Sequence, residues 1–182
     1  MNIMAAIEKA EADELGVKIS GTPQSGQTVE MARAGALCKI FGTSDGMQAE
    51  ALLGHCLKAL KSNEVSDDHP GNDERLFMLS IIRDMDPRDA VERMLAVQMA
   101  ATHVATIRSS RWLAHVETIP QVQAHYTGFN KLARTFAAQV EALRKYRTGG
   151  KQTVVVQRMD VSDGGQAIVG SVRHGGRGSD EG

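Results

Sequence analysis

The strongest periodic pattern of the chain lies between residues 121 and 147. Apolar side chains recur there at alternating intervals of four and three residues, and they are Val122, Tyr126, Phe129, Ala133, Phe136, Val140 and Leu143. Side chains with this spacing lie along one side of a helix. The pattern therefore predicts a long helix whose apolar seam packs on a neighbouring helix.

The preceding segment, 90–107, is apolar on nearly every side of a helical projection. This predicts a helix buried against more than one neighbour. We expect Asp86 to cap this helix, Pro87 to lie in its first turn and Asp89 to face its positive end.

Pro120 interrupts the helical pattern, and only a few residues around it separate the two predicted helices. The simplest arrangement for two helices joined in this way is an antiparallel hairpin. We therefore expect residues 74–148 to form a helical bundle core centred on this hairpin.

Weaker patterns predict further helices in the first half of the chain. Residues 3–15 form one, Thr28 caps a second that ends at Gly42, and Ser44 or Asp45 caps a third. Their core-facing side chains are expected to be Val29, Leu37, Ile40 and Phe41 in the second helix and Met47, Ala51, Leu52, Cys56 and Leu60 in the third.

Residues 61–73 are polar and contain Pro70-Gly71, which predicts an exposed loop. Asn72 or Asp73 then opens a helix that runs to Met85. Residues 1–73 are thus expected to hold acidic helices followed by a polar loop.

The periodicity changes after Gly149-Gly150. Alternating apolar residues, a turn signal at 163–165 and a second apolar run predict a short β-hairpin module over 149–172, followed by a disordered tail over 173–182. Because a two-stranded hairpin is marginally stable alone, we expect it to dock on the helices or to pair with other copies. The residues expected to mediate self-association are Val154, Val156, Met159, Val161, Ile168 and Val169.

The composition agrees with a mainly α fold class, a helical hairpin or bundle with a short C-terminal β-hairpin module. Of 182 residues only 4% are aromatic, while 9 are Met, so the core relies on small and aliphatic side chains. The longest uncharged stretch, 94–107, is too short for a transmembrane helix. Without a basic leader at the N-terminus, and with Cys38 and Cys56 in apolar helical patterns, we expect a cytoplasmic protein with reduced cysteines.

Charge is distributed unevenly. Residues 1–74 carry 6 basic and 12 acidic side chains, whereas residues 75–182 carry 15 basic and 10 acidic ones. A basic region over 131–158 can contact nucleic-acid phosphates or neutralise the acidic half of the chain. The residues expected to contact phosphate are Lys131, Arg134, Lys145, Arg147 and Lys151.

Evidence for catalysis is weak. Residues 21–28 have the spacing of a phosphate-binding loop, but Gln27 replaces the lysine and Pro23 disturbs the match, so a flexible polar loop is the better interpretation. The histidines lack metal-ligand spacing, although a hairpin could bring His115 and His125 together near its turn. Asp84, Asp86 and Asp89 fit a helix end followed by a helix start. We expect no catalytic residue, cofactor or metal.

Three strings in the C-terminal half carry a family resemblance: MLAVQMAATHVATIRSSRWLAHVETIP, FNKLARTFAAQVEALRKYRTGGKQTVVVQ and DGGQAIVG. They resemble a family of uncharacterised proteobacterial proteins associated with prophages and mobile elements, over about residues 75–172. The resemblance implies that the C-terminal tail is a defined module. It implies no activity, cofactor or site residue.

Two functional hypotheses follow from these patterns. The first is a non-enzymatic interaction or assembly protein that self-associates, based on the helical seam and the valine-rich strands. The second is a nucleic-acid-binding accessory factor that uses the basic region 131–158. An enzyme would need a deep pocket that gathers His115, His125 or the aspartates of 84–89.

Overall fold

The computed structural model describes residues 15–67 and 72–149, which belong to one compact unit. Its elements are β1 (Val17–Thr22), β2 (Gly26–Met31), α2 (Ala36–Phe41), α3 (Gly46–Lys58), the short 3₁₀ helix η1 (Ser62–Glu64), α4 (Glu74–Met85), α5 (Ala90–Ala114) and α6 (Ile119–Arg147). The mainly helical fold class is confirmed. The predicted helix over 3–15 lies, except for Leu15, outside the described residues, as do the β-hairpin module and the tail.

The only sheet in the described residues is an antiparallel hairpin of β1 and β2. The prediction of a flexible loop over 21–28 and of a helix that starts at Thr28 was wrong, because residues 26–31 form a strand. Val17 and Ile19 alternate with polar residues and are buried, and Ile19 pairs with Val29 of the second strand. Gly26, with φ of 89°, supplies the left-handed residue that closes this short hairpin turn.

Only residues 36–41 of the predicted second helix are helical. Leu37, Ile40 and Phe41 are buried as expected, and the helix ends at Gly42. The left-handed φ of 60° at Gly42 favours glycine, and a Cβ there would collide with the carbonyl oxygen of Pro87. The segment that precedes α5 therefore packs directly on the end of α2.

The cap of α3 is Asp45, whose side chain accepts a hydrogen bond from the backbone N–H of Gln48 at 3.2 Å. Leu52, Cys56 and Leu60 are buried, as predicted for the core-facing side of this helix. It was wrong for two residues, because Met47 is 81% exposed and Ala51 is exposed. Ala49 and Leu53 are buried instead, so the buried face of the helix is rotated from the predicted one.

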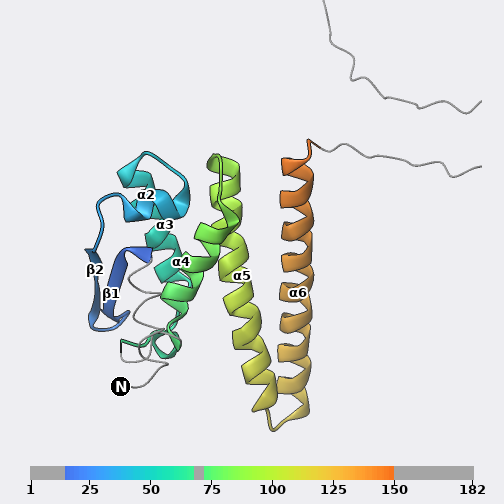
Figure 1. The fold of residues 1–182 in the computed structure, drawn as a ribbon. Helices are drawn as coiled ribbons and strands as arrows, with labels where there is room; N and C mark the ends of the chain where they lie inside the picture. The colour runs from blue at the N-terminus through green and yellow to red at the C-terminus, as the bar shows by residue number, and fades with distance from the viewer. Residues whose placement is uncertain (1–14, 68–71, 150–182) are drawn as a thin grey trace, which may run out of the picture. The chain divides into compact units, whose positions relative to one another are not determined.

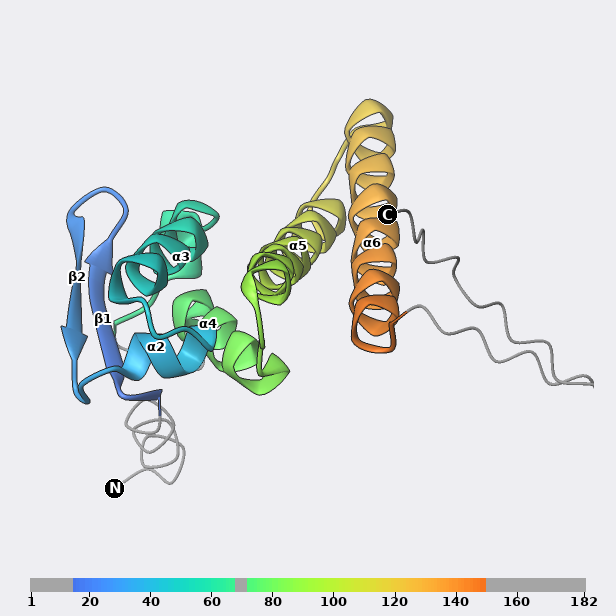
Figure 2. The ribbon, with the colours of Figure 1, turned by 90° about the horizontal axis from the view of Figure 1, so that it is seen from above.

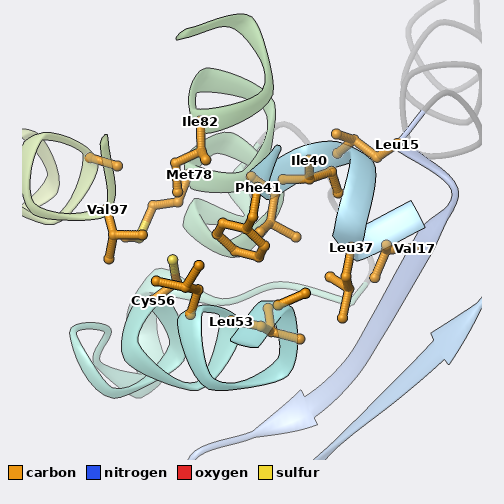
Figure 3. Packing of buried hydrophobic residues seen from close by; sticks show 14 of the residues in the cluster. Leu15, Val17, Leu37, Ile40, Phe41, Leu53, Cys56, Met78, Ile82 and Val97 are labelled. Atoms are coloured by element: carbon orange, nitrogen blue, oxygen red, sulfur yellow. The ribbon is translucent and has the colours of Figure 1, made fainter. Parts of the chain in front are cut away.

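Figure 3 shows how the core is built around Phe41, which is fully buried. Its ring lies between Leu53 and Cys56 of α3 on one side and Met78 and Ile82 of α4 on the other. Cys56 is a free thiol, and burial raises its pKa to about 12. Both halves of the chain thus share one core.

Aspartate side chains cap the N-terminal ends of α4 and α5. Asp73 caps α4 and accepts a hydrogen bond from the N–H of Arg75 at 2.9 Å. The predicted cap of α5 was misplaced by three residues: Asp89 accepts hydrogen bonds from Val91 and Glu92, whereas Asp86, with φ of 45°, ends α4.

The predicted hairpin of two long helices is confirmed (Figure 1). α5 packs against α3, α4 and α6, which accounts for its apolar residues on several sides. Both views place α6 against α5 on the side away from the β-hairpin (Figures 1 and 2). Pro120 lies in the first turn of α6.

Candidate interaction surface

α6 contacts the rest of the described structure mainly through one of its sides. The ring of Phe136 lies 5.9 Å from that of His103 on α5, which in turn lies 5.5 Å from Phe77 on α4. Nearer the hairpin turn, His125 lies 5.5 Å from Trp112. These ring contacts place the side of α6 that carries Phe136 and His125 on α5.

The C-terminal end of α6 is anchored by polar contacts. Arg147 donates hydrogen bonds to both carboxylate oxygens of Glu92, at 2.9 and 3.2 Å, and to the carbonyl of Met85 at 2.6 Å. Tyr146 donates to Asp89 at 2.9 Å, so the residue that caps α5 also holds α6. The hydrogen bonds from Arg147 lower the pKa of the Glu92 carboxyl.

Despite these contacts, α6 has no buried residue along its 29 residues. Phe129, Phe136 and Leu143 of the predicted seam are half-buried, but Val122, Tyr126 and Val140 are 41%, 57% and 44% exposed. The seam is therefore only partly covered by α5. Its exposed members lie at its edge.

The exposed members of the seam, together with Ile119, Ala137 and the half-buried Ala133, form an apolar row along one side of α6, which we call the lateral face of α6. At 3.6 residues per turn, its members fall within about 60° of one another around the helix axis and about 80° from the side that contacts α5. They are Ile119, Val122, Tyr126, Ala133, Ala137 and Val140. Of the twelve exposed large apolar side chains in the described residues, nine lie on α5 and α6.

The basic residues of α6 separate into two groups. Lys131, Arg134 and Lys145 are exposed and lie within about 60° of one another, on the side turned away from α5. Arg147 does not belong to this outer face, because Glu92 binds its guanidinium. Arg147 is thus neutralised within the fold, whereas Lys131, Arg134 and Lys145 lie on an exposed side of the helix.

Glu141 is the one acidic residue near the outer basic face in α6. It accepts two hydrogen bonds from Arg144 at 2.8 Å and lies 3.6 Å from the ammonium of Lys145. The bonds from Arg144 lower the pKa of Glu141 to about 2. Within the described residues, Lys131 and Arg134 form no ion pair.

Two further arginines hold the segment that was predicted to be an exposed loop. Arg108 on α5 binds Glu64 of η1 through two hydrogen bonds of 2.5 and 2.6 Å, and Glu64 is buried. Burial raises the pKa of Glu64, but the bonds from Arg108 and from the Lys61 backbone outweigh it and lower the pKa below 4.5. The expectation of an exposed loop was therefore wrong at Glu64, which is buried within a short 3₁₀ helix.

Arg75 is the largest fully buried side chain of the described structure, at 1% exposure. It donates to Asp73 at 2.7 Å, to Asp67 at 2.8 Å and to the carbonyl of Gly21 at 2.7 Å. These contacts join α4 to the β-hairpin. Sequence reasoning missed them because the partners lie as many as 54 residues apart.

In the described residues, the histidines and aspartates considered as ligands or catalysts lie in or next to α4, α5 and α6. No group of three His, Cys, Asp or Glu side chains could hold a metal ion there. His115 ends α5, and the ring of His125 lies tilted against that of Trp112. A hollow of about 570 Å³ is lined in part by Arg33, Lys39 and Arg83, but Arg83 is paired with its neighbour Asp84 at 3.1 Å.

The helices of residues 15–67 and 72–149 include none with the length and apolar character needed to cross a bilayer. Several predicted site residues lie outside these ranges: Lys151 of the basic region, and Val154, Val156, Met159, Val161, Ile168 and Val169 of the β module. Comparison with known proteins gave no match to a family model, a curated protein or a solved structure.

Proposed function

We propose that this chain is a non-enzymatic interaction protein of the cytoplasm that associates with copies of itself through the lateral face of α6. The observation that carries the proposal is a helix of 29 residues without a buried residue. Most helical stability in proteins comes from the packing of an apolar side, and α5 covers only part of the apolar side of α6. The exposed lateral face therefore offers apolar surface that a partner can cover.

The exposure of individual residues supports this role for α6. Ile119 and Tyr126 are 75% and 57% exposed, and both belong to the same face as Val122 and Val140. Scattered apolar side chains are ordinary on a protein surface, but a contiguous row on one element is typical of an interaction surface. The predicted role of the tail residues 149–172 in self-association, and the family resemblance, stay predictions.

Sedimentation velocity of the full chain, at about 5–200 μM, tests the proposal. We expect a species of twice 19.6 kDa to grow with concentration. Tyr126→Glu should shift this equilibrium to the monomer, because a carboxylate on the lateral face would have to be desolvated in the interface. A wild-type mass of 19.6 kDa at every concentration would overturn the proposal.

Met47→Glu is the matched control for this experiment. Met47 is an apolar residue that is 81% exposed, but it lies on α3 and not on the hairpin. The control variant should associate as the wild type does. Circular dichroism at 222 nm should show equal helix content in all three proteins.

A second candidate function is nucleic-acid binding through the outer basic face. It is favoured by Lys131, Arg134 and Lys145, which share one exposed side of α6. Such a face would contact phosphates without reading base sequence, and its affinity would fall as salt rises from about 50 to 200 mM.

Fluorescence anisotropy with a labelled DNA duplex distinguishes this function from self-association. Lys131→Gln with Arg134→Gln should reduce the magnitude of the slope of log K against log salt by about 2, because each lost phosphate contact contributes about 0.9. Lys39→Gln, an exposed lysine on α2, is the control. An affinity for the duplex that does not change with salt concentration, or no binding at all, would reject the nucleic-acid function.

A further inference from the structure

We propose that Arg75 and the backbone N–H of Gly21 form a binding site for a small oxyanion, and that Asp67 of the same chain occupies this site as an internal ligand. The ligand class is a carboxylate or a phosphate, two oxygens of which each accept one hydrogen bond. The inference concerns the β-hairpin and α4, and it does not depend on the proposed self-association.

The Asp67 carboxylate is held by two donors from different parts of the fold. Its Oδ1 accepts a hydrogen bond from Nη2 of Arg75 at 2.8 Å, and its Oδ2 accepts one from the N–H of Gly21 at 2.9 Å. These hydrogen bonds, from Arg75 first and then from Gly21, lower the pKa of the Asp67 carboxyl, and the charge of Lys18 adds to the effect. The surroundings of the carboxylate therefore favour a negative charge at this place.

Both donors are held in position by contacts that do not involve Asp67. The Arg75 side chain is 0% exposed, its Nε and Nη2 donate to the Asp73 carboxylate, and its Nη1 donates to the carbonyl of Gly21 at 2.7 Å. Gly21 belongs to β1, where it pairs with Gln27 of β2. The donors should therefore keep their positions when the carboxylate leaves. Donors that are fixed in advance bind an anion without the cost of ordering them.

Asp67 is held less firmly than the two donors. Its side chain is 47% exposed, and in the part of the chain that the structure describes its carboxylate bonds only to Arg75 and Gly21. An external oxyanion can therefore reach the donors if it displaces this side chain. Because Asp67 is tethered to the site, its effective concentration there is at least millimolar, and it competes with any free anion.

The site also relates to the sequence pattern of residues 21–28, which have the spacing of a phosphate-binding loop. In such loops, backbone N–H groups bind phosphate oxygens and a lysine of the loop supplies the positive charge. Here the N–H of the first glycine, Gly21, binds a carboxylate oxygen, while the positive charge comes from Arg75 of α4. The arginine thus supplies the charge that the pattern lacks at Gln27.

Solution NMR of the isotope-labelled full chain tests the assignment. Asp67→Ala removes the internal ligand, and the amide signal of Gly21 is followed as sodium acetate or inorganic phosphate replaces sodium chloride at constant ionic strength. We expect a saturable shift with a millimolar dissociation constant, since Asp73 already neutralises much of the Arg75 charge. The two titrations show whether the site prefers a carboxylate or a phosphate.

The wild type should bind the same anion about tenfold more weakly or worse, because its own carboxylate competes for the donors. Asp67→Asn should bind more weakly than Asp67→Ala, because the amide keeps the size of the side chain and still fills the site. Circular dichroism at 222 nm should show the same helix content in all these proteins.

Asp84→Ala is the matched control. Asp84 pairs with Arg83 of the same helix at 3.1 Å, but the two side chains are 62% and 28% exposed. The control removes one negative charge and one arginine partner, as Asp67→Ala does, without creating a pair of fixed donors. Acetate and phosphate should cause no saturable shift of the amides around Arg83.

Thermal unfolding provides a second measurement. Asp67→Ala should have a lower Tm than the wild type, because the Gly21 N–H and the Arg75 guanidinium lose an acceptor. Acetate at about ten times its dissociation constant should raise the Tm of this variant by about 3–6 °C, and the Tm of the wild type and of Asp84→Ala by less.

The outcomes separate the two parts of the proposal. If the Gly21 amide of Asp67→Ala shows no saturable shift with either anion, there is no oxyanion site and the contact is a structural ion pair only. If the wild type and Asp67→Ala bind the anion equally well, the site exists but Asp67 is not its internal ligand.

Discussion

The buried guanidinium of Arg75 supports the sharpest prediction about stability. Its side chain is 0% exposed and that of Asp73 is 2% exposed, so the pair is out of contact with water. Arg75→Met keeps a side chain of similar length in the core but leaves the Asp73 carboxylate without its counter-charge. Breaking a buried ion pair in this way costs about 3–5 kcal/mol.

This cost is large relative to the free energy of unfolding of the whole domain. Domains of this size have unfolding free energies of about 5–15 kcal/mol, so the variant should lose about a fifth or more of the total. We expect the urea midpoint to fall by about 2 M, and Tm by about 6–20 °C, when unfolding is followed by circular dichroism.

Two further variants test the reasoning. Arg83→Met breaks the exposed pair with Asp84 and should cost less than about 1 kcal/mol. Asp73→Asn combined with Arg75→Met should be more stable than Arg75→Met alone, since asparagine keeps the helix cap and carries no charge. If Arg75→Met and Arg83→Met lose the same stability, the buried pair does not hold the fold as argued.

Three other predictions concern the helix junctions and the core thiol. Asp89→Ala removes the cap of α5 and the partner of the α6 end, so amide exchange in the last turn of α6 should become about 2- to 30-fold faster. Because Glu64 and Glu92 have lowered pKa values in the fold, they stabilise it above pH 4.5 and lose this contribution as pH falls further; urea unfolding of Glu92→Gln should therefore depend less on pH between about 5 and 3. Cys38 should react with a thiol reagent at pH 8 well before Cys56, whose pKa is about 12, and equal rates would contradict the buried core.

The long helices were predictable from the sequence because their signals are local. Asp73, Pro120 and the seam of α6 identify helix starts and a buried side within a few residues of chain. The β-hairpin was missed for the same reason, since Val29 fits both a helical pattern and a strand. Val29 lies in a strand because it pairs with Ile19 across the turn.

The contacts that hold the C-terminal end of α6 on the rest of the fold could not be predicted from the sequence. Arg147 was interpreted as a phosphate contact, although it reaches back 55 residues to Glu92. Such pairs depend on tertiary packing and leave no trace in local spacing. The exposure of Val122, Tyr126 and Val140 is similar, because the seam pattern indicates an apolar side but not how much of it a neighbour covers.

The one-sided packing of α6 has a consequence for local unfolding. The helix can detach from α5 without uncovering Phe41 or Met78, so its opening costs less free energy than unfolding of the whole domain. A second copy bound as proposed would add to that cost by mass action. Protection of α6 amides should therefore rise with protein concentration, while protection of α4 stays constant.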